Sequence, residues 1–253
     1  MNRKIRVGAV SYLNTKPLIY GFKHGEMQEE VDLILEHPAK IADMLKNNEI
    51  DVGLVPVAVI PQLKEHHIIS DYCIGCDGEV ASVCLFSEVP LQKIERVLLD
   101  YQSRTSVELL KILIKEYWQI NPEIIATSED YRNDIKGTTA GLIIGDRALE
   151  QRKVSKYIFD LGAEWKKFTE LPFVFAAWIS NKKLDDSFID SFNKQNLTGL
   201  RQIDKVVAEN TYHIFDLKAY YTSYINFYLD DKARKGLHLF LNKLANKPVL
   251  TNN

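Results

Sequence analysis

The chain has 253 residues, of which 46% are apolar and 26% are charged, a composition typical of a globular protein that buries a substantial core. Its formal net charge of -2 argues against a nucleic-acid-binding protein, because there is no large basic excess to neutralise phosphates. The basic start of the chain is followed by a short apolar run that is broken at Ser11. We therefore expect no signal peptide, no membrane span and a cytoplasmic location.

The first part of the chain alternates strand and helix patterns. The predicted strands of this part cover residues 5–10, 31–35, 50–55, 68–76 and 80–86. Ile41, Met44 and Leu45 recur at helical spacing between the second and third of these strands. The alternation is typical of a parallel sheet with right-handed crossovers.

The alternation begins afresh after Pro90. The predicted elements here are strands at residues 97–99, 124–125, 140–145 and 172–179, and a long helix at residues 103–118. From Asp185 onward we expect helices to the end of the chain, with Tyr220, Tyr224 and Tyr228 on one helical face.

This organisation favours an α/β protein with two lobes, the type 2 periplasmic-binding-protein-like fold. The strands at residues 80–86 and 172–179 bracket the middle unit, so we interpret them as a two-strand hinge. The first lobe is then formed by residues 1–85 and 176–253, including a helical C-terminal tail, and the second by residues 86–175. A ligand cleft is expected between the lobes. A single doubly wound sheet is the alternative architecture.

The first candidate ligand loop follows the N-terminal strand. Ser11, Tyr12, Asn14 and Thr15 supply polar groups in this loop, and Pro17 fits the first turn of a helix that follows it. In open α/β sheets ligands bind at such junctions, where free N–H groups at a helix start favour anions. An ordinary turn is the alternative reading of this loop taken alone.

A second junction of the same kind follows the predicted strand at residues 97–99. Ser103 or Thr105 could cap the next helix, and Ser106 adds another hydroxyl. Arg104 offers a fork-shaped donor suited to a carboxylate. A structural salt bridge is an equally good role for Arg104.

Two further positions are weaker candidates. Gly145 permits close approach of the backbone to a ligand, and Asp146 can cap the helix that follows. Ser82 lies on the first predicted hinge strand, where it would reach the floor of the cleft.

Familiar catalytic and metal-binding motifs are missing from the sequence. There is no G-x-S-x-G, H-E-x-x-H, Walker or G-x-G-x-x-G pattern. Cys73 and Cys76 have C-x-x-C spacing, but neither further zinc ligands nor a thioredoxin-like context accompanies them, and we expect no metal. These residues by themselves indicate a binding cleft rich in neutral donors.

Several segments together resemble chorismate dehydratase, the first enzyme of the futalosine route to menaquinone. They read SYLNTKPL from Ser11, DVGLVPVA from Asp51, SVCLFS from Ser82, SRTS from Ser103, IGD from Ile144 and LPFVFAAW from Leu171. The resemblance covers most of the chain and implies the two-lobed fold without metal or organic cofactor. A related enzyme, 1,4-dihydroxy-6-naphthoate synthase, shares that fold but opens with a different motif.

The resemblance implies that the substrate is chorismate, which loses water to give 3-[(1-carboxyvinyl)oxy]benzoate. Asn14 is then expected to orient the reacting ring or the leaving hydroxyl, and the other polar residues of the loops are expected to bind carboxylates. Because the motifs contain no obvious protein base, we expect the enolpyruvyl carboxylate of the substrate to take the C3 proton. A non-catalytic binding protein for a small dicarboxylate is the alternative from another class, and the oligomeric state is left open.

Overall fold

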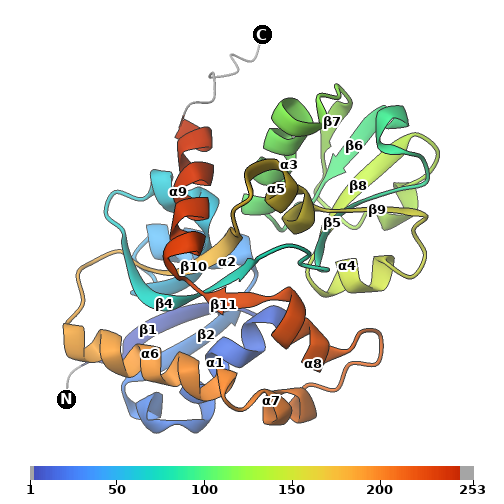
Figure 1. Ribbon diagram of the computed structural model, residues 1–253. Helices are drawn as coiled ribbons and strands as arrows, with labels where there is room; N and C mark the ends of the chain where they lie inside the picture. Colours follow the sequence, from blue (N-terminus) through green and yellow to red (C-terminus); the bar gives the residue numbers. More distant parts are fainter. Residues whose placement is uncertain (1–2, 246–253) are drawn as a thin grey trace.

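The computed structural model describes residues 3–245 and contains two sheets, each with its own helices (Figure 1). We call the unit built on the first sheet lobe 1 and the unit built on the second sheet lobe 2. The predicted two-lobed α/β fold is confirmed. Within residues 3–245 no helix is both long and apolar enough to cross a membrane.

Lobe 1 contains a six-stranded mixed sheet in the order β11-β4-β10-β3-β1-β2. Its strands are β1 (Ile5–Val10), β2 (Val31–Glu36), β3 (Val52–Pro56), β4 (His67–Cys76), β10 (Phe173–Ser180) and β11 (Asn226–Tyr228). β1 is parallel to β2 and β3, whereas β10 runs antiparallel to β3 and β4. Its helices are α1 (Lys16–His24), α2 (Pro38–Lys46), α6 (Asp186–Leu200), α7 (Ile203–Glu209), α8 (Leu217–Ala219) and α9 (Asp231–Ala245).

Lobe 2 contains a five-stranded sheet in the order β7-β6-β8-β5-β9. Its strands are β5 (Val83–Ser87), β6 (Arg96–Leu99), β7 (Glu123–Ala126), β8 (Thr139–Ile144) and β9 (Tyr157–Asp160). Its helices are α3 (Thr105–Ile112), α4 (Asp146–Gln151) and α5 (Leu161–Thr169). α3 continues into the π-helix η5 (Leu113–Trp118), so the predicted long helix at residues 103–118 is present with a change of winding.

Short 3-10 and π segments complete the chain. They are η1 (Leu13–Thr15), η2 (Glu26–Glu29), η3 (Val57–Gln62), η4 (Leu91–Lys93), η6 (Arg132–Asp134) and the π-helix η7 (Tyr220–Tyr224).

The chain passes between the sheets at slightly different positions from those expected. β5 pairs along its whole length with β8 and β9, so the first crossing lies between Cys76 and Val83 rather than at residue 85. β10 belongs wholly to the first sheet, and the return therefore precedes Phe173 rather than residue 176. Each of the two predicted hinge segments thus forms a strand within a single sheet, where its backbone groups find hydrogen-bond partners.

The C-terminal region is not helical throughout. β11 pairs antiparallel with β4 and places Tyr228 in a strand, where its side chain is half exposed, while Tyr220 and Tyr224 lie in η7. The expectation of one helical face with three tyrosines is therefore wrong. The aromatic run at this point suits an edge strand as well as it suits a helix.

The two lobes share apolar packing near the crossings. Trp165 of α5, Phe173 of β10 and Phe240 of α9 form an edge-to-face cluster, with ring centroids 5.0–6.3 Å apart. All three side chains are fully buried. Edge-to-face aromatic contacts of this kind add stability beyond the buried area itself.

Asp51 holds the ends of three strands of lobe 1 together. Its buried carboxylate accepts hydrogen bonds from Arg6 N at 2.9 Å, Arg3 Nη2 at 3.0 Å and Lys182 Nζ at 2.9 Å. Burial by itself would raise the pKa of Asp51, but the hydrogen bonds from Arg6, Lys182 and Arg3 lower it well below the usual range. The charged form is therefore the one that stabilises the fold.

We predict that Asp51→Asn lowers the free energy of unfolding by about 2 kcal/mol at pH 7. Because the folded pKa of Asp51 lies below the unfolded one, this difference should be complete above about pH 5 and shrink as the pH falls through about 4. Denaturant unfolding of both proteins across this pH range measures it. Exposed Asp134→Asn is the control, and a difference that does not depend on pH would contradict the assignment.

Candidate functional site

A cavity lies between the two lobes at the carboxyl ends of β1, β3, β6 and β8. It is lined by Val10, Tyr12, Asn14, Pro38, Pro56, Ile74, Val80, Ser82, Val83, Ser103, Thr105, Ser106, Ile144, Gly145, Phe175 and Ala176. Both lobes and the crossing segment contribute to this wall. The position agrees with the rule that ligands of open α/β sheets bind beyond the carboxyl ends of the strands.

The structure brings seven of the eleven predicted site residues to this cavity. They are Tyr12, Asn14, Ser82, Ser103, Thr105, Ser106 and Gly145. The other four, Ser11, Thr15, Arg104 and Asp146, do not line it. The role of each residue in ligand binding stays a prediction.

The four residues outside the lining have other surroundings. Ser11 is exposed, whereas Thr15 is fully buried and donates to Asn14 Oδ1 at 3.4 Å. Arg104 Nη2 donates to Asp43 Oδ1 at 2.9 Å, an ion pair that joins α2 of lobe 1 to the start of α3 in lobe 2. Asp146 Oδ1 accepts from Leu13 N at 3.2 Å. Thr15 and Asp146 therefore contact residues at or next to the cavity lining, and Arg104 joins the two lobes.

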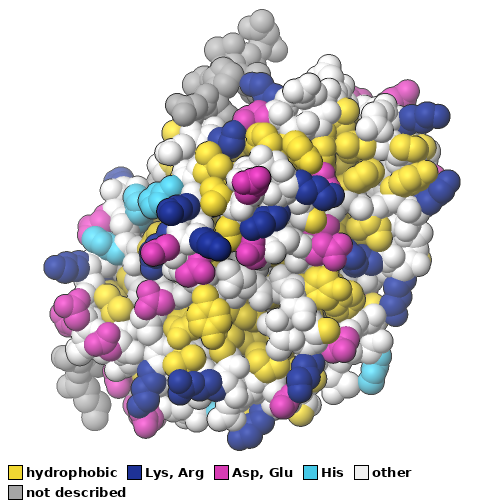
Figure 2. Space-filling model, in the orientation of Figure 1, with side chains coloured by type: hydrophobic (Ala, Val, Ile, Leu, Met, Phe, Trp, Pro, Cys, Tyr) yellow, Lys and Arg dark blue, Asp and Glu magenta, His cyan; other side chains and the backbone are white. Residues whose placement is uncertain are grey.

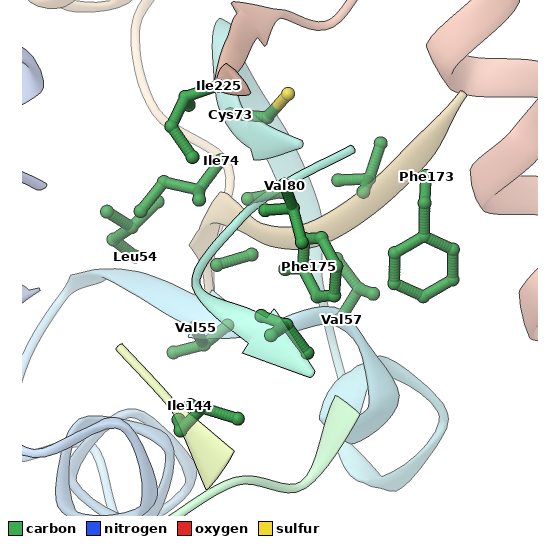
Figure 3. Packing of buried hydrophobic residues seen from close by; sticks show 14 of the residues in the cluster. Leu54, Val55, Val57, Cys73, Ile74, Val80, Ile144, Phe173, Phe175 and Ile225 are labelled. Carbon is green, nitrogen blue, oxygen red and sulfur yellow. The ribbon is translucent and has the colours of Figure 1, made fainter. Parts of the chain in front are cut away.

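Apolar side chains form one wall of the cavity. Figure 3 shows Val80 and Phe175 close together, and Ile74 lies on β4, next to β10 in the sheet of lobe 1, whereas Ile144 lies on β8 of lobe 2. Phe175 and Val80 come from β10 and the crossing segment, and Ile144 comes from the end of β8. Such apolar groups suit the face of a flat ring, while the polar residues of the lining can fix the orientation of the ring.

The polar wall begins at the start of α3. The helix begins after Arg104 at its N-cap, and Ser103, one residue earlier, accepts a hydrogen bond from Ser106 N through its Oγ at 3.1 Å. Thr105 Oγ1 accepts from Ala58 N of lobe 1 at 3.2 Å. Thr105 and Ser106 are both buried, and their hydroxyls lie where the helix N-terminus favours negative charge.

Gly145 and Tyr12 form a close contact between the lobes. Gly145 has a φ of 65°, which favours glycine, and a Cβ at this position would lie 3.2 Å from the Tyr12 ring. The Tyr12 hydroxyl donates to Gln102 Oε1 in lobe 2. Burial, and then the nearby Asp100, raise the pKa of Tyr12, so its phenol is neutral at physiological pH.

Next to Tyr12 lies a partly buried ion pair that the sequence reasoning missed. Arg147 Nη2 donates to Asp100 Oδ2 at 2.8 Å and to Gln102 Oε1 at 3.0 Å. Asp100 also accepts from the main-chain N–H groups of Gln102 and Ile144. The ion pair thus fixes Gln102, whose Oε1 accepts the hydrogen bond from the Tyr12 hydroxyl. Asp100 lies three residues before the segment SRTS and Arg147 directly follows IGD, but their pairing depends on β6 and β8 being neighbours.

Tyr12 is the only side chain of the cavity lining that can titrate; the wall described here contains no Asp, Glu, His, Lys, Arg or Cys. Among the described residues, no group of three or more His, Cys, Asp or Glu side chains is placed to hold a metal ion. On the face seen in Figure 2, positive and negative side chains are interspersed. Attraction of an anion to this cavity therefore depends on local hydroxyl, amide and main-chain donors.

Comparison with known proteins agrees with this architecture. Residues 5–246 match a family described as menaquinone biosynthesis. The chain is 27% identical over 265 residues to a chorismate dehydratase of Thermus thermophilus, covering 94% of each chain.

Solved structures with low sequence identity share the fold. A protein of Archaeoglobus fulgidus superimposes with a TM-score of 0.75 at 15% identity, covering 96% of each chain. A Candida albicans gene product described as having the generic periplasmic binding protein fold gives a TM-score of 0.62 at 10% identity, covering 100% of this chain and 92% of the other. This chain therefore belongs to the menaquinone biosynthesis family and has the periplasmic-binding-protein-like fold.

Proposed function

We propose that this protein is a cytoplasmic hydro-lyase that removes water from chorismate and yields 3-[(1-carboxyvinyl)oxy]benzoate, on the futalosine route to menaquinone. The observation that carries the proposal is the match to a chorismate dehydratase over 94% of both chains. The interlobe cavity supports it, because its lining combines apolar groups with neutral donors. That combination suits a compact ring that carries two carboxylates.

The reaction breaks the C3–H and C4–O bonds of chorismate. The electron pair of the C3–H bond forms the C3=C4 double bond, the C4 hydroxyl leaves with the proton as water, and the ring becomes aromatic. The C3 proton is conjugated through the ring alkene to the ring carboxylate, so donors on that carboxylate stabilise developing charge. Because aromatisation favours the product, the main task of the protein is to align the reacting groups.

We assign the alignment to Asn14 and the hydroxyls around it. Asn14 lies at the cavity wall, and its Oδ1 accepts from Thr15, which leaves the amide N–H groups to donate into the cleft. In this role Asn14 orients the leaving hydroxyl or the reacting ring. Ser82, Thr105 and Ser106, with main-chain N–H groups, are proposed to bind the two carboxylates.

The substrate itself is proposed to supply the base. No carboxylate, imidazole or amine of the described chain lines the cavity, and the Tyr12 phenol keeps its proton. The enolpyruvyl carboxylate is attached through oxygen at C3, so it can reach the C3 proton within the same molecule. An intramolecular transfer of this kind needs orientation more than acid–base strength.

We expect purified protein to convert chorismate to an aromatic product that is lighter by one water. Ultraviolet absorbance and mass spectrometry measure the conversion. Binding of chorismate without any conversion would instead favour a non-catalytic dicarboxylate-binding protein.

We predict that Asn14→Ala lowers kcat by roughly 10²-fold and changes KM much less, because it removes an orienting donor rather than a general binding contact. Steady-state kinetics with chorismate measures both constants. Asn133→Ala, at an exposed position of lobe 2, is the matched control. A kcat equal to that of the unmodified protein would remove Asn14 from the mechanism.

The dependence of kcat on pH should be flat between about pH 6 and 9. Both carboxylates of the substrate are ionised in this range, since carboxylic acids titrate near about pH 4. The raised pKa of Tyr12 keeps the one titratable side chain of the wall protonated. An inflection near about pH 6.5 would point to a histidine base and contradict the substrate-derived base.

A further inference from the structure

Ser82 is held rigidly at the point where the chain crosses from lobe 1 to lobe 2. It is fully buried, its main-chain N–H donates to Val80 O at 2.8 Å, and its carbonyl accepts from Gly145 N at 2.8 Å. The preceding Ala81 has a left-handed φ of 63°, and Ala81 N donates to Asp160 Oδ2 at 2.8 Å. The backbone therefore fixes the direction in which the Ser82 side chain points.

The hydroxyl of Ser82 receives a hydrogen bond from a residue distant in the sequence. Tyr220 of η7 donates its phenolic O–H to Ser82 Oγ at 2.7 Å, and Tyr220 is fully buried. Burial raises the pKa of the Tyr220 phenol, which keeps its proton at neutral pH. The phenol therefore has a proton to donate in the hydrogen bond to Ser82 Oγ.

The donation leaves the hydrogen of Ser82 available. Its one acceptor among the described residues is Val80 O at 3.5 Å, at the limit of a hydrogen bond. Since Ser82 lines the cavity, a ligand oxygen is a better partner for this hydrogen. A hydroxyl that accepts one hydrogen bond also becomes a stronger donor of another.

We propose that Tyr220 is a positioning residue: its O–H occupies a lone pair of Ser82 Oγ and so directs the Ser82 hydroxyl to donate to a carboxylate of the ligand. This rests on the proposed function, in which the cleft holds a small dicarboxylate. Tyr220 does not touch the ligand and acts through Ser82.

The chain supplies a matched control in the next residue. Tyr221 is also buried, and its hydroxyl has no hydrogen-bond partner in the described part of the chain. Tyr220→Phe and Tyr221→Phe thus each remove one buried phenolic hydroxyl and keep the ring. Only Tyr220→Phe disturbs Ser82, so a merely structural effect of losing such a hydroxyl should appear in both variants.

The test is a double-mutant cycle of Tyr220→Phe and Ser82→Ala with a probe that cannot react. Calorimetric titration with 3-(carboxymethoxy)benzoate, an aromatic dicarboxylate, measures affinity, and thermal unfolding verifies that each variant folds. Tyr220→Phe should weaken binding roughly tenfold, as expected for a hydrogen bond to a charged group, while Tyr221→Phe should not. In the Ser82→Ala background Tyr220→Phe should have no further effect.

Three results would overturn the inference: unchanged affinity in Tyr220→Phe, additive effects of Tyr220→Phe and Ser82→Ala, or no binding of the probe to the unmodified protein. Failure of the proposed function looks different. In that case the probe binds with the expected coupling of the two substitutions, but the unmodified protein does not convert chorismate, and the role of Tyr220 stands.

Discussion

The contact of the loop after β1 with the loop after β8 determines the geometry of the cleft. The Tyr12 ring lies on Gly145, and the neighbouring Leu13 N–H donates to Asp146. Loops at the carboxyl ends of parallel strands emerge at one edge of a sheet, so each lobe gathers its polar loops on a single side. Where those sides meet, Asn14 and the start of α3 line the same cavity. A side chain at position 145 would press on the Tyr12 ring and would be strained by the left-handed φ of 65°.

Local sequence patterns predicted much of this arrangement. The polar loops after β1, β6 and β8 were recognisable because turn residues and a helix start follow a short apolar strand, and they contribute six of the seven predicted residues that line the cavity. The two-lobed fold was also predictable, since the middle unit repeats the order of the first. Periodicity alone could not predict where the chain crosses between the lobes, because a buried apolar strand has the same sequence pattern in either sheet.

Interactions between distant segments were not predictable in the same way. The pairing of Asp100 with Arg147 requires β6 and β8 to be adjacent, and the bond from Tyr220 to Ser82 joins positions 138 residues apart. The sequence left two roles open for Arg104, binding a ligand carboxylate or forming a structural salt bridge, and the structure pairs Arg104 with Asp43. Its side chain retains partial exposure, so this ion pair contributes little stability of its own.

The neutral lining of the cavity and the proposed chemistry have one physical origin. An ionised side chain in a partly buried cleft needs a partner, because an unpaired buried charge is costly. Here the strong charges, Asp100 and Arg147, lie outside the lining and pair with each other, while the polar groups of the lining are hydroxyls and an amide. Such a surface binds carboxylates through hydrogen bonds without neutralising them by a formal positive charge. An arginine partner would lower the pKa of a bound carboxylate and make it a weaker base. Without such a partner, a carboxylate of the substrate can still accept a proton.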